Sequence, residues 1–287
     1  MSLCNRCPNN CGVDRKNGKV GACGVDENLK IAKYYLHKFE EPIISAVNGS
    51  GTVFFTGCSL KCVFCQNYSL SRNERGKIIT PNNLADIFKQ LEDMGADNIN
   101  LVTPTHYTTE IAKALDLYKP NIPIVYNTHS YENLENLKFI NDYVDIYLPD
   151  LKFFSPKVSA RYTGKSDYFE KASNAVKFMM QAKKTVIDGK KMLSGVIVRH
   201  LILPLNKNDS KSIIKWFSEN KNGGAYFSLM AQYTPYGDYA KYPELSRSIT
   251  KKEYDSVLNY LMDLNVTDCF IQQLNSSSEK FIPDWDY

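Results

Sequence analysis

The hydrophobic pattern of the chain changes repeatedly between two periods from about residue 51 onward. Short apolar runs, which are typical of buried strands, alternate with segments in which apolar residues recur three and four positions apart, as on one face of a helix. The apolar runs predict six strands, at residues 53–55, 99–102, 122–126, 144–148, 196–201 and 226–230. A further run at residues 29–36 predicts a strand that leads into this region.

Capping signals mark where several of the predicted helices begin. Thr80 followed by Pro81 predicts the start of a helix with a clear apolar stripe. Thr250 and Glu253 form a capping-box signature for the last helix. Ser130 is expected to cap a helix that follows the third strand.

Strands separated by single helices predict parallel βαβ units with right-handed crossovers. Six such repeats form an incomplete barrel, so we expect an α/β protein built on a partial (β/α)6 barrel that is open along one side. Such folds place reacting groups on the loops at the C-terminal ends of the strands. The expected organisation is a cysteine-rich extension at residues 1–28, the barrel at residues 29–267, and a C-terminal strand and tail at residues 268–287.

Composition and charge exclude several classes of protein. The 287 residues are 43% hydrophobic and 23% charged, which is ordinary for a globular chain. A net charge of +4 is too small to indicate nucleic-acid binding. No apolar run reaches the roughly 18 residues of a membrane span. The first residues, from Met1 to Arg6, lack the apolar core of a signal peptide, and we expect a cytoplasmic protein.

Eight cysteines change this picture, because they lie in two groups and one isolated position. The second group, Cys58, Cys62 and Cys65, has C-x3-C-x2-C spacing and follows the first barrel strand directly. Three thiolates on one short loop can hold three corners of a 4Fe-4S cluster and leave one iron open for a ligand. Zinc prefers four ligands at a different spacing. The remaining alternative is a set of buried free thiols.

The first group has C-x2-C-x3-C-x11-C spacing and consists of Cys4, Cys7, Cys11 and Cys23. Four thiolates are enough for a structural zinc ion or for a second, closed cluster, and the spacing leaves both open. The glycine-rich segment around them is too small to fold on a core of its own, which favours a metal as the cross-link. The isolated Cys269 lies in a short apolar run and is expected in the core.

In the spacing of these cysteines and their position after the first barrel strand, the sequence resembles the radical S-adenosylmethionine (SAM) superfamily. Within it, the chain is similar to the pyruvate formate-lyase activating enzyme-like branch that has a cysteine-rich N-terminus. The resemblance covers most of the chain and rests on the cluster loop and on eight further motifs, namely CNRCP from Cys4, CGVDR from Cys11, GACG from Gly21, FCQNY from Phe64, NINLVTPTH from Asn98, VYNT from Val125, YLPDLK from Tyr147 and VRHL from Val198.

The resemblance implies a chemistry as well as a fold. A reduced 4Fe-4S cluster would cleave SAM to methionine and a 5′-deoxyadenosyl radical, which abstracts hydrogen from a substrate. The implied activity is that of an activating-enzyme-like oxidoreductase. Its substrate would be a glycyl-radical enzyme, another protein, a peptide or a small metabolite, and its electron donor a flavodoxin or ferredoxin. A non-enzymatic iron–sulfur electron carrier or redox sensor is the alternative, and it would need no polar groups at the strand ends.

The resemblance also assigns expected roles to residues at the strand ends. Lys152 and Arg199 are expected near the SAM carboxylate, as the catalytic pair, and Asp150 is expected to position Lys152 or bind a cation. Thr103 stands where the family commonly has the glutamate of a Gly-Gly-Glu motif, so that contact is replaced. The remaining cofactor-binding candidates are Phe64 against adenine, Asn127 and Thr128 toward the ribose and carboxylate, and Gln232. The candidates for substrate contact are His106, His129 and Tyr233.

Overall fold

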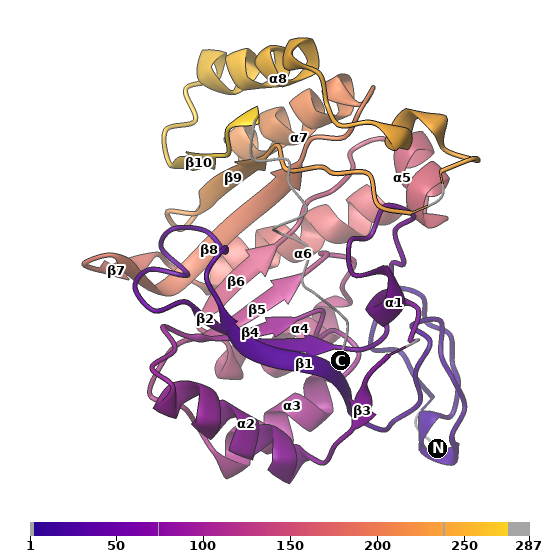
Figure 1. Ribbon diagram of the computed structural model, residues 1–287, viewed down its shortest axis with the longest axis vertical. Coiled ribbons are helices and arrows are strands. Elements are labelled where there is room, and N and C mark those ends of the chain that lie inside the picture. Colours follow the sequence, from indigo (N-terminus) through magenta and orange to yellow (C-terminus); the bar gives the residue numbers. More distant parts are fainter. Residues whose placement is uncertain (1–2, 74, 238, 275–287) are drawn as a thin grey trace.

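In the computed structural model, described here for residues 3–73, 75–237 and 239–274, most strands join one open, mostly parallel sheet (Figure 1). Its strand order is β10-β9-β8-β6-β5-β4-β2-β1-β3, and β7 pairs with β8 beside this path. The strands are β1 (Lys30–His37), β2 (Ser50–Phe55), β3 (Lys77–Ile78), β4 (Ile99–Val102), β5 (Ile124–Thr128), β6 (Ile146–Pro149), β7 (Val186–Asp188), β8 (Lys191–Leu201), β9 (Tyr226–Met230) and β10 (Cys269–Ile271).

The six predicted strands are confirmed as the parallel run β2-β4-β5-β6-β8-β9. β10 adds a seventh parallel strand beside β9, whereas β1 pairs antiparallel with both β2 and β3 at the other edge. The sheet therefore stays open, as the prediction of a partial barrel requires. Cys269 begins β10 and is half-buried rather than in the core. The tail at residues 275–287 lies outside the described residues.

The α-helices connect and cover these strands, with α2 and α3 at one end of the sheet and α7 and α8 at the other (Figure 1). They are α1 (Tyr68–Ser71), α2 (Pro81–Asp93), α3 (Thr108–Leu117), α4 (Leu134–Ile140), α5 (Pro156–Thr163), α6 (Tyr168–Ala182), α7 (Lys207–Asn220) and α8 (Lys251–Asp263). No helix in the described ranges is both long and apolar enough to cross a membrane.

Two predicted helix starts are confirmed and one is wrong. Thr80 and Thr250 each form a reciprocal capping box, with Asn83 and Glu253 respectively. Ser130 does not cap α4, because α4 begins at Leu134 with Asn133 as its N-cap. Ser130 instead adopts a left-handed conformation, with φ of 63°, in a turn where its amide donates to the Thr128 hydroxyl. Thr128 ends β5, so this turn reverses the chain before the helix.

The connection from β1 to β2 enters the interior of the open barrel. We call residues 38–45 the floor segment. Within it Ile44 is fully buried and packs against interior side chains of the sheet, namely Val125, Ile146, Leu148 and Ile197. Because these residues precede the C-terminal strand ends, the floor segment closes the opposite end of the barrel interior. The space above it is open toward the cluster loop.

The cysteine-rich extension packs on the barrel and shares its hydrophobic core. Cys23 and Val25 belong to the same buried cluster as the barrel strands. In Figure 1 the extension lies beside α1 and β3. The boundaries at residues 28 and 267 remain predictions.

Candidate functional site

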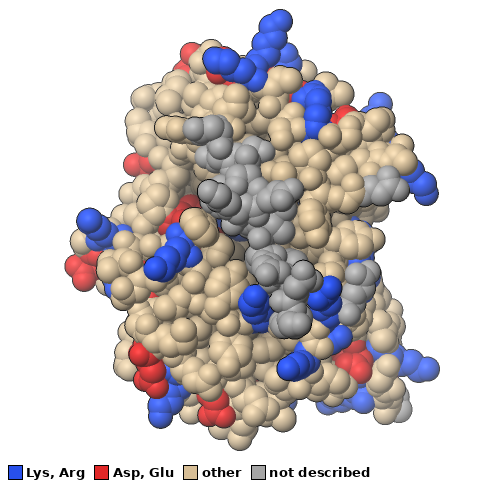
Figure 2. All heavy atoms as spheres, viewed as in Figure 1, with Lys and Arg blue, Asp and Glu red and all other residues tan. Residues whose placement is uncertain are grey.

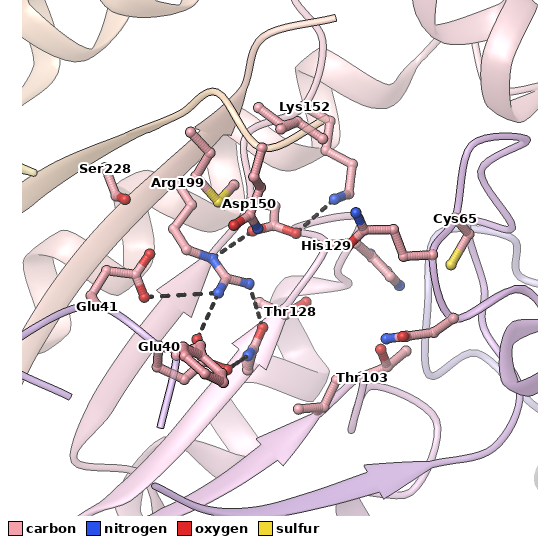
Figure 3. A pocket seen from close by; sticks show the side chains of 18 of the residues that line it. Glu40, Glu41, Cys65, Thr103, Thr128, His129, Asp150, Lys152, Arg199 and Ser228 are labelled. Carbon is pink, nitrogen blue, oxygen red and sulfur yellow. Dashed lines mark hydrogen bonds and ion pairs between the residues drawn. The ribbon is translucent and has the colours of Figure 1, made fainter. Parts of the chain in front are cut away.

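A cavity of about 570 Å³ lies between the C-terminal strand ends, the cluster loop and the floor segment (Figure 3). Most of the residues that the sequence singles out line it: Cys58, Cys62, Phe64, Cys65, Thr103, Asn127, Thr128, His129, Asp150, Lys152, Arg199, Gln232 and Tyr233. The volume is typical of a small-molecule or cofactor site. The fold therefore gathers residues that are up to 175 positions apart in sequence, from Cys58 to Tyr233.

The three cysteines of the cluster loop face this cavity from residues 58–65. Backbone hydrogen bonds hold the loop: the Cys58 amide donates to Cys23 O at 3.0 Å, and the Val63 amide donates to Tyr162 O at 2.9 Å. Burial raises the pKa of Cys58 to about 11 and also raises that of Cys62. Such thiols ionise when a metal binds them.

The donor set fits a cluster better than a single ion. In the described chain no group of three or more His, Cys, Asp or Glu side chains is spaced to hold one metal ion. In a 4Fe-4S cluster each thiolate binds a different iron, so the sulfurs need not converge on one point. Three thiols around one cavity therefore fit a cluster bound by three cysteines.

Phe64 lies in the same loop and forms part of the cavity wall. It is 7% exposed and makes edge-to-face contacts with Phe153, Tyr162 and Tyr233, with ring centroids 5.9, 6.1 and 6.4 Å away. These neighbours fix the ring, which leaves it suited to pack against a flat ligand group. The Tyr233 hydroxyl donates to Leu245 O at 2.6 Å, so this tyrosine presents its ring to the cavity.

Lys152 and Asp150 form a buried ion pair at the end of β6. Lys152 Nζ lies 2.6 Å from Asp150 Oδ2, and Arg199 Nε lies 2.7 Å from Oδ1 of the same carboxylate. Although burial alone would raise it, these two cations lower the pKa of Asp150 below its ordinary value. Burial opposes the charge of Lys152 as well, but Asp150 keeps the pKa of this lysine raised. All three groups are therefore ionised at neutral pH.

Arg199 is already surrounded by acceptors from the protein. Besides Asp150, its Nη1 lies 3.0 Å from Glu40 Oε2 and its Nη2 donates to Asn127 Oδ1 at 2.7 Å (Figure 3). All three nitrogens of the guanidinium are engaged. We therefore expect Lys152, which interacts electrostatically with Cys62, to be the cation that meets a cofactor carboxylate.

Sequence reasoning missed Glu40 and Glu41 altogether. Both belong to the floor segment and line the cavity, and Glu41 Oε2 lies 3.9 Å from Arg199 Nη1. Their only signal in the sequence is a pair of acidic residues after an apolar strand, which is common at exposed loops. Nothing in the pattern indicates that the following Ile44 draws this loop into the barrel.

His129 lines the cavity as a neutral imidazole. Its Nδ1 accepts from the Tyr131 amide at 3.1 Å, so its Nε2 carries the proton and donates to Ser59 Oγ at 2.9 Å. Burial, together with the nearby Lys152 charge, lowers the pKa of His129 to about 3. The histidine thus supports the cluster loop through Ser59.

His106 does not reach the cavity, contrary to the expectation of a substrate contact. It is 1% exposed, and its Nε2 lies 2.8 Å from Thr56 O. Its ring lies 4.4 Å from that of Tyr107, under the cysteine-rich extension. Arg6 and Arg15 of the extension both donate to His106 O at 2.7 Å. The backbone of this residue therefore anchors the extension.

Three other candidates line the cavity with constrained side chains. Thr103 has a positive φ of 58° at the end of β4, a conformation uncommon for threonine. The Thr128 hydroxyl donates to Glu132 Oε1 at 2.5 Å, behind the cavity wall. Gln232 Oε1 accepts from Gln272 Nε2 at 2.9 Å.

Glu132 is a buried carboxylate behind the cavity wall. Its Oε1 accepts from Thr105 and Thr128, while its Oε2 has no hydrogen-bond partner in the part of the chain that the structure describes. Burial raises the pKa of Glu132 to about 7, although the two hydroxyls act in the opposite direction. The folded pKa thus lies above that of the unfolded chain.

Glu132→Gln is expected to flatten the pH dependence of stability. The contribution of Glu132 is fully present below about pH 4.5 and is lost as the pH rises through about 7, by about 3 kcal/mol. Urea unfolding at pH 5 and pH 8 would measure the difference between wild type and variant. Relative to the wild type, the free energy of unfolding of the variant should be higher at pH 8 than at pH 5. The exposed Glu135→Gln is the control, and an equal difference at both pH values contradicts the expectation.

The four N-terminal thiols lie close together in the extension. Cys11 interacts with the Cys4 thiol, and Cys23 interacts electrostatically with Cys4 and Cys11. A Cβ on Gly21 would come within 3.2 Å of the Cys11 sulfur and 3.5 Å of the Cys23 sulfur, so glycine leaves the space beside these thiols open. They are nonetheless not spaced for one metal ion in the described chain.

The extension is hydrogen-bonded directly to the cluster loop. The Cys58 amide donates to Cys23 O at 3.0 Å, and Asn9 Nδ2 donates to Ser59 O at 2.8 Å. Arg6 adds an ion pair with Glu110, at 2.8 Å. The two cysteine groups are therefore neighbours in space.

Comparison with known proteins decides the family. Residues 52–217, which hold the cluster loop and most of the cavity wall, match the family model of the Radical SAM superfamily. This chain belongs to the radical SAM superfamily. It is accordingly a radical SAM enzyme, which binds SAM and, as the family does, a 4Fe-4S cluster. The particular branch that the N-terminal cysteines suggest is not part of this match.

One curated relative and two solved structures are similar to this chain. An uncharacterized protein of Methanocaldococcus jannaschii is 30% identical over 274 residues, which are 92% of this chain and 75% of that protein. SuiB of Streptococcus suis, bound to its precursor peptide SuiA, is 14% identical with a TM-score of 0.52, covering 75% of this chain and 46% of SuiB. Native anSMEcpe with bound AdoMet is 18% identical with a TM-score of 0.50, and the match covers 75% of this chain and 61% of that protein. This chain spans about half the length of SuiB, and both structures support the fold alone.

Proposed function

We propose that this radical SAM enzyme holds its cluster on Cys58, Cys62 and Cys65, binds SAM in the adjoining cavity, and abstracts a hydrogen atom from a substrate there. The observation that carries the proposal is the meeting of three thiols with the Lys152–Asp150 pair in one cavity. When bound and reduced, the cluster supplies the electron that cleaves SAM to methionine and a 5′-deoxyadenosyl radical.

The protein's own residues bind and orient the reactants. Lys152 binds the SAM carboxylate as a point charge, and Asp150 holds Lys152 in place. Phe64 packs against the adenine, and the remaining cofactor contacts come from Thr103, Asn127, Thr128 and Gln232. Tyr233 and His129 border the substrate. The floor segment and the aromatic wall limit the access of water to the cavity, which protects a radical from side reactions.

An electron carrier or redox sensor without catalysis is the alternative function. Such a protein needs a cluster with four protein ligands and has no use for a charged cavity beside it. The cluster loop here offers three thiols, and Lys152, Asp150 and Arg199 are buried at the cavity wall at a cost in desolvation. These features favour an enzyme.

The substrate and partners are proposed from the resemblance and the surface. We propose a protein, peptide or small-metabolite substrate, with a glycyl-radical enzyme as one candidate, and a flavodoxin or ferredoxin as electron donor. On the face shown in Figure 2, basic and acidic side chains of the described residues are interspersed, which does not favour nucleic acid. We propose a cytoplasmic location because the clustered cysteine spacing of the sequence is typical of metal binding in a reducing compartment.

Formation of 5′-deoxyadenosine tests the proposed function. The protein is reconstituted with iron and sulfide without oxygen, reduced with dithionite and incubated with SAM. Chromatography should detect 5′-deoxyadenosine and methionine in amounts that exceed those of a cluster-free sample. Absence of product from a sample with a complete cluster would favour the electron carrier.

We also propose that the N-terminal thiols bind a second metal centre, zinc or a closed cluster, of which the cluster agrees better with their spacing in the described chain. Their proximity and their burial support this, since burial raises the pKa of Cys7 to about 11 and a metal is the usual means of ionising such a thiol. The double variant Cys7→Ser, Cys23→Ser is expected to lose this metal and keep the four irons of the other cluster. Elemental analysis of zinc and iron per chain measures both. Equal metal content in variant and wild type contradicts the proposal.

A further inference from the structure

The floor of the cavity carries two glutamates from a segment that precedes the barrel strands. Glu40 and Glu41 stand on the floor segment beside the buried Ile44, so they face the cavity from the end opposite to the cluster loop. Figure 3 shows Glu41 and Cys65 at opposite sides of the site, with Asp150 and Lys152 between them. A ligand group that reaches Glu41 therefore lies on the side of the site opposite to Cys65.

Two buried oxygen atoms on this floor lack a hydrogen-bond donor. Glu41 is 8% exposed, and neither its Oε2 nor the Oδ1 of Asn100 accepts a hydrogen bond from any described residue. Arg199 Nη1, at 3.9 Å from Glu41 Oε2, is too distant to donate to it. Asn100 donates to Glu40 Oε1 at 2.9 Å, which fixes the orientation of its amide. Asn100 Oδ1 and the Oε2 of an ionised Glu41 are both acceptors, so the group that completes this floor must be a donor.

The balance of charges around the floor also indicates that a donor with a positive charge binds there. Three carboxylates, Glu40, Glu41 and Asp150, face two buried cations, Lys152 and Arg199. Lys38 also lines the cavity, but it is exposed and its charge is largely solvated. Of the three carboxylates, Glu41 has the longest contact with Arg199, since Glu40 and Asp150 approach the guanidinium to 3.0 and 2.7 Å. Burial raises the pKa of Glu41 to about 7, so a cation bound close to its carboxyl group would hold it ionised at neutral pH.

We propose that Glu41 binds a primary ammonium group of the substrate. The ammonium supplies the missing donor to Glu41 Oε2 and balances the third carboxylate, which a neutral hydroxyl would not do. A guanidinium is less suitable, because it would place a second wide cation beside that of Arg199. The inference rests on the proposed function for the rest of the site, and it narrows the substrate class to amines with a free –NH₃⁺ group.

Binding of a simple amine to the loaded protein tests the inference without turnover. The oxidised holoprotein, with cluster and SAM bound, is titrated with n-pentylammonium and with 1-pentanol, and saturation-transfer NMR reports binding. We expect the wild type to bind n-pentylammonium at least tenfold more tightly than 1-pentanol. Glu41→Gln should lower the affinity for n-pentylammonium at least tenfold and leave the affinity for 1-pentanol unchanged. Glu135→Gln, which removes an exposed charge on α4, should change neither.

Each contrary outcome overturns the inference. Equal affinity for ammonium and alcohol in the wild type does so without any variant, and so does full ammonium affinity in a folded Glu41→Gln protein. If Glu41→Gln lowers the affinity for SAM by the same factor as the affinity for n-pentylammonium, Glu41 binds the amino group of the cofactor instead. Failure of the proposed function is recognised separately, because it appears as absence of 5′-deoxyadenosine in the wild type.

Discussion

Replacing Cys62 by alanine is expected to abolish the formation of 5′-deoxyadenosine, with a fall of at least about 10³-fold, or roughly 4 kcal/mol in transition-state stabilisation. Cys62 is the middle ligand of the loop, and like Cys58 and Cys65 it interacts electrostatically with Lys152. With two thiols left, the loop cannot hold three irons of a cluster. The measurement is 5′-deoxyadenosine per chain after anaerobic reconstitution, together with iron content.

Cys269→Ala is the matched control for this experiment. Cys269 is also a partly buried thiol, but it belongs to β10 and lies outside both cysteine groups. We expect the control to retain cluster absorbance and product formation close to those of the wild type. Product formation by Cys62→Ala at the wild-type rate would show that the cluster is held elsewhere.

Arg199→Met is expected to lower the free energy of unfolding by about 3–5 kcal/mol, since it removes one partner from a buried charge network. The methionine leaves Glu40 and Asp150 without their 3.0 and 2.7 Å contacts, and the side chains of both carboxylates are at most 15% exposed. Arg199→Lys should recover part of the loss, because it restores the charge without the planar fork. Urea unfolding at pH 7 measures all three proteins.

Arg161→Met provides the comparison at the surface. Arg161 Nε lies 2.6 Å from Glu244, but the arginine side chain is 46% exposed. Loss of this pair should cost at most about 1 kcal/mol. If Arg199→Met costs no more than Arg161→Met, the network around Arg199 does not stabilise the fold.

Much of the fold follows from periodicity because the parallel strands are buried on both faces. β2, β4 and β5 are short apolar runs between turn signals, and no helix pattern competes with them. Thr80 and Thr250 were predictable because a capping box is a local interaction within four residues. Ser130 was not, since its left-handed turn depends on the Thr128 hydroxyl and on the packing of Glu132 behind it.

The residues of the candidate site likewise fall into those that local sequence predicts and those that depend on contacts between distant parts of the chain. Cys58, Cys62 and Cys65 are predictable because their spacing is itself the signal. Glu40 and Glu41 are not, because their position depends on Ile44 entering the barrel, which is a contact between distant parts of the chain. His106 follows a strand in the manner of a site residue, yet the extension covers it, and the sequence does not indicate where the extension docks.

The hydrogen bond from the Cys58 amide to Cys23 O has a consequence for any shortened form of the chain. Residues 1–28 would be an obvious piece to remove, since they precede the residues that match the family model. Their removal would take away the acceptor that fixes the first cluster cysteine and would uncover the core around Leu29 and Tyr107. A truncated protein would therefore differ from the full chain at its catalytic centre, and the extension is better regarded as part of the cluster's scaffold than as an appendage.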